Sequence, residues 1–556
     1  MKRYFSLILL LFVFLVGCEQ DSQVTDEPIE KIDSFTWLVF DTWSYEVKTL
    51  SLDWEDLLVR AFENIVYVKN PVDKEYQVMN IYVPENYYSW EEINGFVLET
   101  APIFFPNKVG WYMAAKPETL WGNESGDYSA FLDAIKSSWG QPQWKKESFW
   151  DFSGGMNKWG FPWKEWMWWM WMGWFWGNRT SASLYALKNG FVVASAWARW
   201  RSLQNEEWKY IWKAPAWIVD LKAAVRYLKY NDGLIPWDSN KIISNWTSAG
   251  WAMSVLLWAT ANHPDYEPYF EELWAAPTSD DIYAVSSYCP ITNLDNADKA
   301  YEWEFYWVDT YSKIAADQLD YNADRSETEQ GAVSDDESEI AALLKDAFPF
   351  YVSSLWLVDI NWNVYSLNED WEWNLKESIK LMLVDSFNDA LQSGEFLSGD
   401  FSWLTVEDWE VVAIDFDSYV KDYLARNKWI PAFDGLSLEA WENNLFWDES
   451  INNRHFTDFS YEHSLVSWEM APSEVVKLMN PMNYIPDSQT TVSKFRRIRH
   501  WAKDADTSLA IPFILSEALT QWRGANVDFK YPWNQWHGWD YDIPELMAWM
   551  NSITHE

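Results

Sequence analysis

One serine of the chain stands in a setting that suits a nucleophile. Ser248 lies within residues 245–251, Asn-Trp-Thr-Ser-Ala-Gly-Trp, after an expected strand at 241–244 and before a helical run at 252–261. A serine at a sharp turn from a strand into a helix presents its hydroxyl for acyl transfer. That turn needs small residues two positions before and after the serine, because a side chain there would collide with neighbouring elements. The structural alternative is a serine at an ordinary tight turn.

A nucleophilic serine needs a base, and the chain has only six histidines. In a hydrolase with such a strand–serine–helix turn, the chain order is serine, then an acid, then histidine. His537 follows an expected C-terminal strand at 527–531, whereas His263 is too close to the helix after Ser248. The other four precede or adjoin the region expected for the acid or lie near the chain end: His455, His463, His500 and His555. His537 is therefore the predicted base, against the alternative of a loop histidine without a role.

The acid that orients the base is expected shortly before the last helix pair. Asp504 and Asp506 both fit this position. Either could instead cap the helix that begins near Thr507, since aspartate is a favoured N-cap residue. Spacing alone does not choose between them.

Strands and helices alternate around these residues. A helix is expected at 217–230, where apolar residues recur at helical spacing, and further helices at 509–523 and 543–550. The alternation predicts a mainly parallel sheet with helices on both faces, the α/β-hydrolase fold. Expected strands precede and follow the serine, with β-branched or alternating apolar residues, at 65–68, 79–83, 102–106, 190–195, 241–244 and 527–531.

The alternation stops in the middle of the chain. With 556 residues the protein is too long for one hydrophobic core. Residues 291–470 are acidic and poor in strand formers, so we expect them to form an inserted lid domain; residues 320–339 are expected to be a loose loop. The hydrolase core is then built from residues 59–290 and 471–556.

The N-terminus resembles an export signal. Lys2 and Arg3 precede a short apolar run that ends in Leu-Val-Gly-Cys at Cys18, which is typical of a bacterial lipobox. We expect residues 1–18 to be a lipoprotein signal peptide, Cys18 to be lipidated and residues 19–58 to form an acidic tether and N-terminal segment. An uncleaved N-terminal anchor is the alternative. The protein would then lie in the cell envelope, at the extracytoplasmic face of the membrane.

The remaining cysteine and the charge limit the partners. Cys289 is the only other cysteine, so lipidation of Cys18 leaves no intrachain disulfide, and Cys289 is interpreted as a small buried apolar residue. The chain holds 42 basic and 84 acidic residues, a net charge of −42. Such a charge excludes nucleic acid and an anionic membrane surface as partners, leaving only the N-terminal lipid as a membrane contact.

Tryptophan and glycine are present in inverted amounts. The chain has 45 Trp and only 20 Gly, although glycine normally makes up about 7% of a protein. Many tryptophans stand in turn contexts that favour glycine, such as Trp139, Trp237 and Trp539, and residues 159–176 form a dense block of them. We therefore expect many of these positions to be glycine in the living cell, through a UGA codon that its genetic code reads as glycine. A Trp-rich, non-catalytic, glycan-binding lipoprotein is the alternative, and the codons distinguish the two.

Several blocks along the chain resemble those of bacterial tannases, also called tannin acyl hydrolases. They run in order from residue 60 to residue 550, and Trp stands where that family has glycine at 111, 246, 251, 447, 501 and 539. The blocks are residues 61–68, 100–103, 106–112, 213–216, 245–251, 287–291, 431–434, 442–446, 497–500 and 538–542.

The resemblance implies roles for named residues. Ser248 would attack the ester carbonyl, His537 would move the proton and Asp504 would orient His537. The backbone N–H groups of Ala249 and Trp111 would form the oxyanion hole.

It also implies a substrate. The resemblance assigns the hydroxyls of a galloyl ring to Lys428, Glu442 and Asp506, because two carboxylates and an ammonium can accept from and donate to adjacent phenolic groups. Asn427 is a departure, since an apolar or long residue is expected before Lys428. The expected substrate is a small aromatic ester, with no metal and no organic cofactor; a feruloyl esterase or a general carboxylesterase of the same fold is the alternative.

Overall fold

The computed structural model describes residues 38–53, 55–106, 120, 181–199, 203–234, 237–247, 249–314, 328–366, 373–393, 401–446, 453–466, 470–533 and 541–556. Four residues assigned to the candidate site or to lipidation lie outside this part of the chain: Cys18, Trp111, Ser248 and His537. Among the residues described, no helix combines the length and apolar character needed to cross a lipid bilayer.

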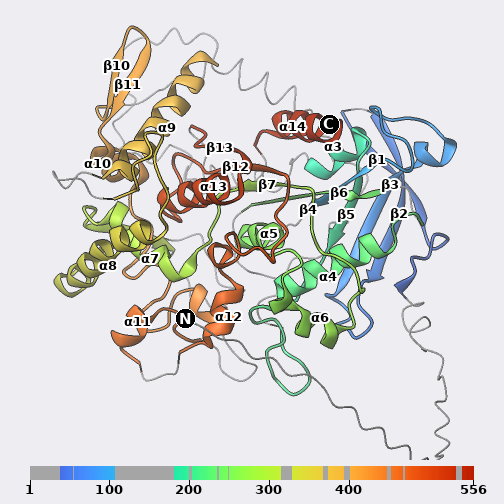
Figure 1. Cartoon of the computed structure of the whole chain (residues 1–556), viewed down its shortest axis with the longest axis horizontal. Helices are drawn as coiled ribbons and strands as arrows, with labels where there is room; N and C mark the ends of the chain where they lie inside the picture. The colour runs from blue at the N-terminus through green and yellow to red at the C-terminus, as the bar shows by residue number, and fades with distance from the viewer. Residues whose placement is uncertain are drawn as a thin grey trace, which may run out of the picture. The chain divides into compact units, whose positions relative to one another are not determined.

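A nine-stranded sheet forms the centre of the fold (Figure 1). The first three strands and β5 pair antiparallel, and from β5 onward each strand pairs parallel with the next. The strands, in spatial order, are β1 (Glu46–Leu52), β2 (Glu55–Val66), β3 (Val78–Pro84), β5 (Val192–Ala196), β4 (Pro102–Pro106), β6 (Asp238–Thr247), β7 (Ala284–Tyr288), β12 (Phe495–Arg499) and β13 (Asn526–Lys530).

The central strands are buried along their whole length. Every residue of β3, β4, β5, β7 and β12 is buried, so these strands are covered on both faces; β4 is a continuous apolar run, whereas β12 carries three buried arginines. Parallel strands are stable only when helices cover both faces of their sheet. The predicted α/β fold is therefore confirmed in its strand pattern.

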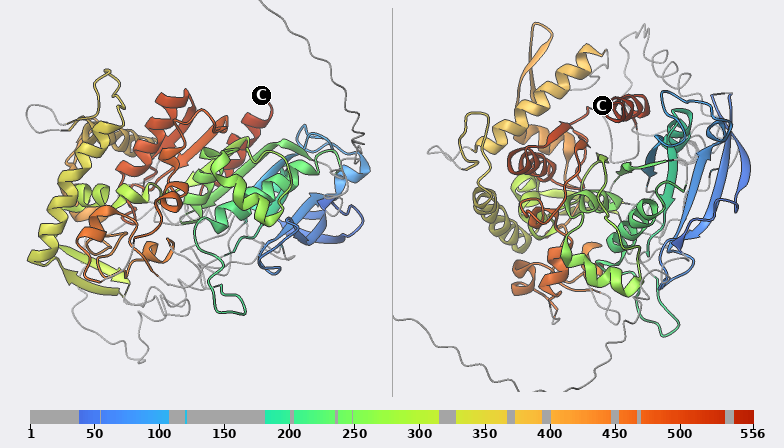
Figure 2. Two further views of the ribbon diagram at one scale, coloured as in Figure 1. Left: turned by 60° about the horizontal axis from the view of Figure 1, so that its bottom comes forward. Right: turned by 45° about the vertical axis from the view of Figure 1, so that its right-hand side comes forward.

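Helices cover both faces of this sheet (Figures 1 and 2). In Figure 1, α3 (Ala182–Lys188) and α14 (Ile543–Thr554) lie above β4 to β6, and α4 (Ala216–Tyr230) and α5 (Ala249–Ala259) lie below them. The other elements of the core are η2 (Glu85–Ser89), η3 (Pro264–Tyr266), α6 (Glu267–Leu273), α12 (Ser473–Leu478), η6 (Pro481–Asn483) and α13 (Ala510–Arg523).

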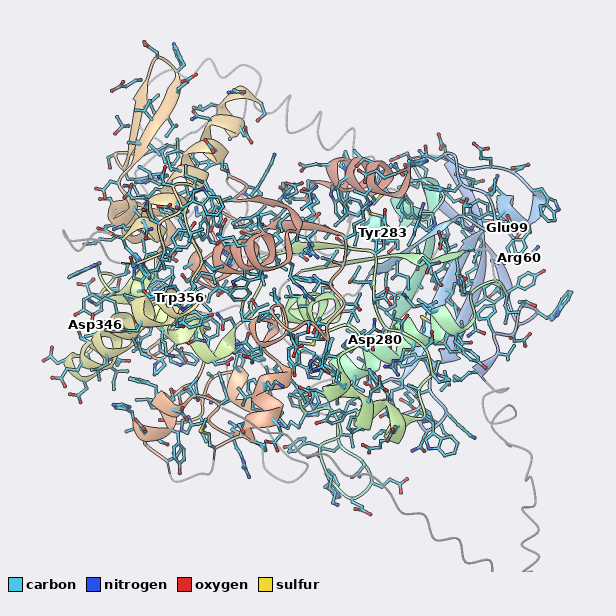
Figure 3. The ribbon with its side chains drawn as sticks, in the orientation of Figure 1. Arg60, Glu99, Asp280, Tyr283, Asp346 and Trp356 are labelled. Atoms are coloured by element: carbon cyan, nitrogen blue, oxygen red, sulfur yellow. The ribbon has the colours of Figure 1, made fainter. Side chains whose placement is uncertain are left out.

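Buried ion pairs attach α4 to the chain that enters β7. Nζ of Lys222 lies 2.9 Å from Oδ1 of Asp280, and Nε of Arg226 lies 3.2 Å from its Oδ2. Asp280, labelled in Figure 3, is fully buried, as is Lys222. Removing one partner would leave an uncompensated charge in the interior, which costs about 3–5 kcal/mol. These pairs therefore hold β7, and the residue that follows it, in a defined position.

The chain between β7 and β12 forms helices and two small hairpins, drawn in yellow-green to orange in Figures 1 and 2. The helices and strands pack beside the β12–β13 end of the sheet in both figures. The elements are α7 (Leu294–Phe305), β8 (Thr310–Ile314), β9 (Thr328–Ala332), α8 (Asp335–Ser354), α9 (Asn374–Gln392), β10 (Leu404–Glu407), β11 (Glu410–Ile414), α10 (Phe416–Tyr419), η4 (Val420–Leu424), η5 (Glu442–Asn444) and α11 (Asp458–Glu462). That residues 291–470 act as a lid stays a prediction.

The expected loose loop at 320–339 is wrong from residue 328 onward. Residues 328–332 form β9, which pairs antiparallel with β8. Ser334 then caps α8: its Oγ accepts a hydrogen bond from the amide of Glu337, whose carboxylate accepts in return from the backbone of Ser334. Such a capping box satisfies two N–H groups at a helix start, so an acidic, polar sequence can begin a helix here. Residues 320–327 lie outside the described part of the chain.

Candidate active site

Four parallel strands end in one row at the same edge of the sheet. The pairs Thr247–Tyr288, Tyr288–Arg499 and Arg499–Lys530 align the last residues of β6, β7, β12 and β13. The residues that follow in the sequence are Ser248, Cys289, His500 and Tyr531. The carboxyl edge of such a sheet is where ligands bind in open α/β folds. The register therefore identifies this edge as the candidate active site.

The elements around Ser248 have the arrangement that the sequence predicted. Strand β6 ends at Thr247, and helix α5 begins at Ala249. Ser248 itself is not among the described residues, and neither are two of its expected partners, His537 and Trp111. The described part of the candidate site therefore consists of the acidic loop after β12 and the segments that pack against it.

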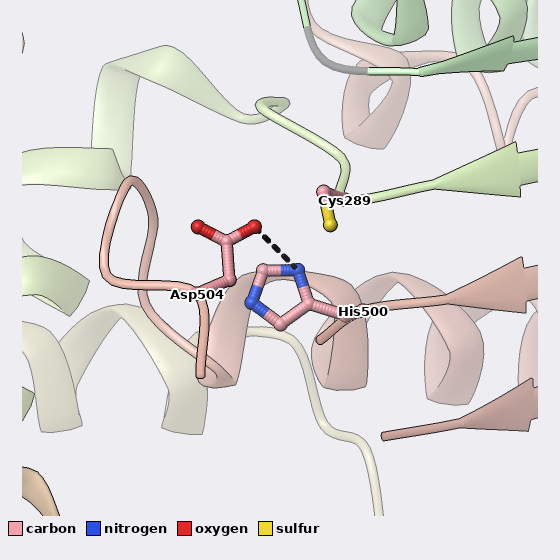
Figure 4. A group of neighbouring side chains, drawn as sticks. All are labelled: Cys289, His500 and Asp504. Carbon is pink, nitrogen blue, oxygen red and sulfur yellow. Dashed lines mark ion pairs between the residues drawn. The ribbon is translucent and has the colours of Figure 1, made fainter. Parts of the chain in front are cut away.

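Asp504 lies buried in the loop that follows β12. Its exposed fraction is 1%, and its Oδ1 accepts a 2.9 Å hydrogen bond from the amide of Asp506. Nδ1 of His500 lies 4.0 Å from the other carboxylate oxygen, Oδ2 (Figure 4). The loop thus turns back on itself and fixes one side of the Asp504 carboxylate with its own backbone.

Cys289 completes a buried group with these two residues (Figure 4). One ligand-type atom from each of Cys289, His500 and Asp504 lies within 4.8 Å of the other two. Burial, and then the charge and hydrogen bond of Asp504, hold the pKa of the Cys289 thiol well above its usual value. A thiol must lose its proton to ligate a metal ion, so this environment favours a protonated hydrogen-bond donor over a metal ligand.

The sequence interpretation of Cys289 was incomplete. It predicted a small buried apolar residue, and the residue is buried, but its sulfur faces a carboxylate and an imidazole. One signal could have indicated this: Cys289 follows an expected parallel strand directly, as Ser248 does. Residues at such strand ends meet at one edge of the sheet.

Asp506 has a different environment from Asp504. It is partly exposed, and its Oδ1 accepts a 2.6 Å hydrogen bond from Nδ2 of Asn427. The hydroxyl of Tyr301, on α7, approaches both segments, lying 3.1 Å from Oδ1 of Asn427 and 3.0 Å from the carbonyl oxygen of Ala505. Asn427, the departure noted in the sequence, therefore belongs to the frame that positions Asp506.

Lys428 packs beside the same frame. Its Nζ lies 3.8 Å from the ring centroid of Phe433, a cation–π contact. The Phe433 ring in turn packs edge-on against Tyr301, with the centroids 6.0 Å apart. Tyr301 therefore connects the neighbourhood of Lys428 with that of Asp506.

Glu442 is connected to this neighbourhood through hydrogen bonds to the buried side chain of Asp434. Glu442 is only 4% exposed and begins the short helix η5. Its neighbour Asn443 donates a 2.6 Å hydrogen bond to Oδ1 of Asp434, which follows Phe433 directly in the chain. Asp434 also accepts hydrogen bonds from Nδ1 of His455 at 2.7 Å and from the amides of Phe456 and Thr457. The segments that carry Lys428, Glu442 and Asp506 are thus joined in one network.

A second buried carboxylate, that of Glu304, binds the chain just after the acidic loop. Oε2 of Glu304 accepts a 2.6 Å hydrogen bond from Oγ of Ser508 and a 2.8 Å bond from the amide of Leu509, at the start of α13. Burial raises the pKa of Glu304 to about 8; the two hydrogen bonds oppose this, and the charge of Asp504 adds to it. Glu304 is therefore largely protonated at neutral pH and anchors the helix that follows the loop.

Of the comparisons with known proteins, the one with solved structures found matches. No family model matches the sequence, and no curated protein matches it. Tannase from Fusobacterium nucleatum is 40% identical, with a TM-score of 0.78 over 93% of this chain and 99% of that one. Tannase from Lactobacillus plantarum is 32% identical, with a TM-score of 0.78 over 93% of this chain and 100% of that one. A tannin acyl hydrolase in complex with ethyl gallate is 32% identical, with a TM-score of 0.77 and coverage of 93% and 99%.

Proposed function

Because the chain belongs to the bacterial tannase family, we propose that it is a serine esterase that hydrolyses galloyl esters of polyphenols. It is a carboxylic ester hydrolase with the α/β-hydrolase fold. The single observation that carries the proposal is the match to tannases over 93% of the chain, at 40% and 32% identity. The acidic loop and the Lys428 neighbourhood at one edge of the sheet support it.

The proposed chemistry proceeds in two steps. The hydroxyl of Ser248 attacks the ester carbonyl while His537 takes its proton, and Asp504 orients His537. The bond to the alcohol breaks, His537 returns the proton to the leaving oxygen, and a galloyl ester of Ser248 remains. Water then attacks this acyl-enzyme with the same base and releases gallate. The N–H groups of Ala249 and Trp111 hold the oxyanion in both steps.

The galloyl ring is bound by its three phenolic hydroxyls in this proposal. The carboxylates of Asp506 and Glu442 accept from two of them, and the Lys428 ammonium donates to the third. Asn427 positions the Asp506 carboxylate for this purpose by donating to its Oδ1. A ring without hydroxyls would gain nothing from these groups and would leave them desolvated and unpaired.

A panel of three esters tests this specificity. We expect kcat/KM to be at least about 100-fold higher for methyl gallate than for methyl benzoate, because a site built to bind hydroxyls rejects an analogue that lacks them. Methyl ferulate should be intermediate or poor. A preference for the ferulate, or equal rates for all three, would instead favour a feruloyl esterase or a general carboxylesterase.

The nucleophile turn requires glycine where the sequence has Trp246 and Trp251, and the structure supports glycine at other Trp positions. Among the residues that the structure describes, six tryptophans adopt positive φ, between 50° and 69°, the left-handed region that costs an L-residue roughly 1–2 kcal/mol. Trp274 closes α6 in this conformation, a position that glycine normally occupies. Five of the six are more than 75% exposed, and one of these, Trp356, is labelled in Figure 3. The six are Trp90, Trp208, Trp274, Trp356, Trp362 and Trp409.

Buried tryptophans give a second, independent argument. A buried indole N–H normally finds a hydrogen-bond acceptor. Within the described ranges, six buried tryptophans have an Nε1 without any such partner, whereas glycine would bring no indole to satisfy: Trp197, Trp212, Trp237, Trp258, Trp373 and Trp501.

We therefore propose that these positions, with 246 and 251, are glycine in the native polypeptide because the cell reads UGA as glycine. Mass spectrometry of tryptic peptides from the native protein tests this directly. Glycine at 246 and at 409 is the expected result; tryptophan at both, encoded by UGG, would contradict it. Genuine tryptophans together with glycan binding that survives Ser248→Ala would favour the non-catalytic, glycan-binding alternative.

The location of the protein also stays a proposal. Residues 1–37 lie outside the described part of the chain, so the lipobox ending at Cys18 rests on its sequence. In this proposal the lipid on Cys18 holds the enzyme at the extracytoplasmic face of the membrane. Labelled palmitate should enter the parent protein and should not enter Cys18→Ser. Equal labelling of both would contradict the proposal.

A further inference from the structure

Cys289 is a buried nucleophilic group that the proposed mechanism does not use. It follows β7 directly, is fully buried and takes a φ of +57°. Its amide donates a 2.7 Å hydrogen bond to the carbonyl oxygen of Arg499, the last residue of the neighbouring strand β12. A non-glycine residue held at positive φ costs about 1–3 kcal/mol and persists only where the surroundings fix it. The fold therefore turns this side chain in one direction.

The side chain of Cys289 is directed toward Asp504. In Figure 4 the sulfur of Cys289 points into the space between the Asp504 carboxylate and the His500 ring. The three side chains come from two neighbouring strand ends, and all three are buried. The raised pKa of the thiol means that its proton stays on sulfur at neutral pH, where it can donate toward the carboxylate.

The two oxygens of Asp504 have different partners. The amide of Asp506 donates to Oδ1, while Oδ2 faces Nδ1 of His500 at 4.0 Å. His500 is held edge-on against the ring of Tyr531, with the centroids 6.1 Å apart. The loop amide therefore holds one oxygen of the Asp504 carboxylate, and the buried His500 ring limits the space beside the other.

We propose that Cys289 and His500 are positioning residues that hold the carboxylate of Asp504, the proposed acid of the triad, through the buried Cys289–His500–Asp504 cluster. The inference rests on the proposed function, because it requires Asp504 to be the acid of the triad. The S–H group donates to the carboxylate and so lowers its basicity. Without this donor, Asp504 would rotate more freely and would hold a proton on His537 more strongly.

The substitution Cys289→Ala tests the donor, and Cys289→Ser restores it. With methyl gallate, we expect kcat to fall about tenfold in the alanine variant, the size of one hydrogen bond to a charged group, with KM unchanged. The acid limb of the kcat/KM profile should move to higher pH, since a more basic carboxylate raises the pKa of the histidine. Cys289→Ser should recover most of kcat and the parental limb.

Matched measurements separate this role from a packing role. Ser516→Ala removes another buried hydroxyl, one that donates only to the carbonyl of Phe513, and should leave kcat and the profile unchanged. An alanine variant with parental kcat and acid limb would overturn the proposal, as would a folded Cys289→Ser variant that is as impaired as Cys289→Ala.

A chemical measurement on protein that retains Cys289 covers the case in which the alanine variant does not fold. Methylmercury would be titrated against Cys18→Ser protein, in which Cys289 is the only thiol. Loss of hydrolysis in proportion to sulfur modified, with KM unchanged in the remaining activity, is the expected result. Full modification with full activity would overturn the inference. Failure of the proposed function has a different signature, because galloyl hydrolysis would then be absent from the parent or insensitive to Ser248→Ala.

Discussion

Nδ2 of Asn427 donates a 2.6 Å hydrogen bond to Oδ1 of Asp506, across 79 positions of sequence. This bond joins the segment after η4 to the loop after β12, and so connects the chain between β7 and β12 with the sheet edge. Asp506 is one of the residues proposed to bind the galloyl ring. A residue that departs from the family pattern therefore contacts the proposed substrate site directly.

Asn427→Ala should weaken substrate binding more than it slows chemistry. The Asp506 carboxylate would lose a fixed donor and would no longer be held at one angle to the ring hydroxyls. We expect KM for methyl gallate to rise about tenfold, equivalent to about 1.4 kcal/mol, with kcat within about threefold of the parent. Steady-state kinetics would measure both. Asn388→Ala, which removes an amide paired with the backbone of Val411, is the control and should change neither.

Lys428→Ala should weaken discrimination between hydroxylated and plain rings. The Nζ group is held over Phe433 and is proposed to donate to a phenolic oxygen. We expect kcat/KM for methyl gallate to fall about 10–100-fold, in the range of a hydrogen bond from a charged group, while methyl benzoate is unaffected. Lys421→Ala, at an exposed position in η4, is the matched control. A gallate rate indifferent to Lys428→Ala would contradict the assigned substrate site.

Glu304→Gln should change how stability depends on pH. Burial raises the pKa of Glu304 to about 8, so the folded state keeps a proton that the unfolded state releases above its ordinary pKa near 4.5. This contribution is fully present below that ordinary value and is lost as pH rises through about 8, by at most about 1.4 kcal/mol per pH unit. Glutamine carries no such cost, so the variant should gain stability relative to the parent between pH 5 and pH 8.

Thermal unfolding at the two pH values would measure this difference. The pKa of Asp298 is also raised to about 8 by burial and by the nearby charge of Asp434, and it contributes the same slope to both proteins. The difference between parent and variant therefore isolates Glu304. A stability difference that is the same at pH 5 and pH 8 would show that Glu304 is not buried as described.

Trp409→Gly should stabilise a protein made with tryptophan at that position. Trp409 has a φ of +69° and is 91% exposed, so the substitution relieves backbone strain and removes few contacts. We expect a gain of about 1 kcal/mol in the free energy of unfolding. Trp307→Gly is the matched control: that residue is 66% exposed but is not among those with positive φ, and glycine there should be neutral or destabilising. Equal effects at both positions would remove the structural argument for glycine.

Much of the fold could be predicted because the local signals are strong. The helix expected at 217–230 is α4, and the strand, serine and helix order at 241–261 agrees with β6 and α5. Both cases depend on apolar periodicity within one element, which is visible in a single stretch of sequence. The acidic start of α8 was not predicted, because its apolar content is low. The capping box that stabilises this helix start spans only four residues, Ser334 to Glu337.

The site could be predicted only where residues adjoin a strand or helix in sequence. The choice between Asp504 and Asp506 depends on burial: the first is enclosed by its own loop, whereas the second is partly exposed beside Asn427. The contacts of Cys289 with Asp504 and of Tyr301 with Asn427 join positions 100 or more residues apart, and no local pattern encodes them. Such pairs follow from the register of neighbouring strands and from packing between elements.

Hydrolysis of methyl gallate by the Ser248→Ala variant tests the central claim most directly. The protein would be made with glycine at 246 and 251, and its folding would be checked against the parent. Gallate release should fall at least about 1000-fold, because no acyl-enzyme can form without the serine hydroxyl. Release of gallate at the parental rate would contradict the assignment of Ser248 as the nucleophile and, with it, the proposed mechanism.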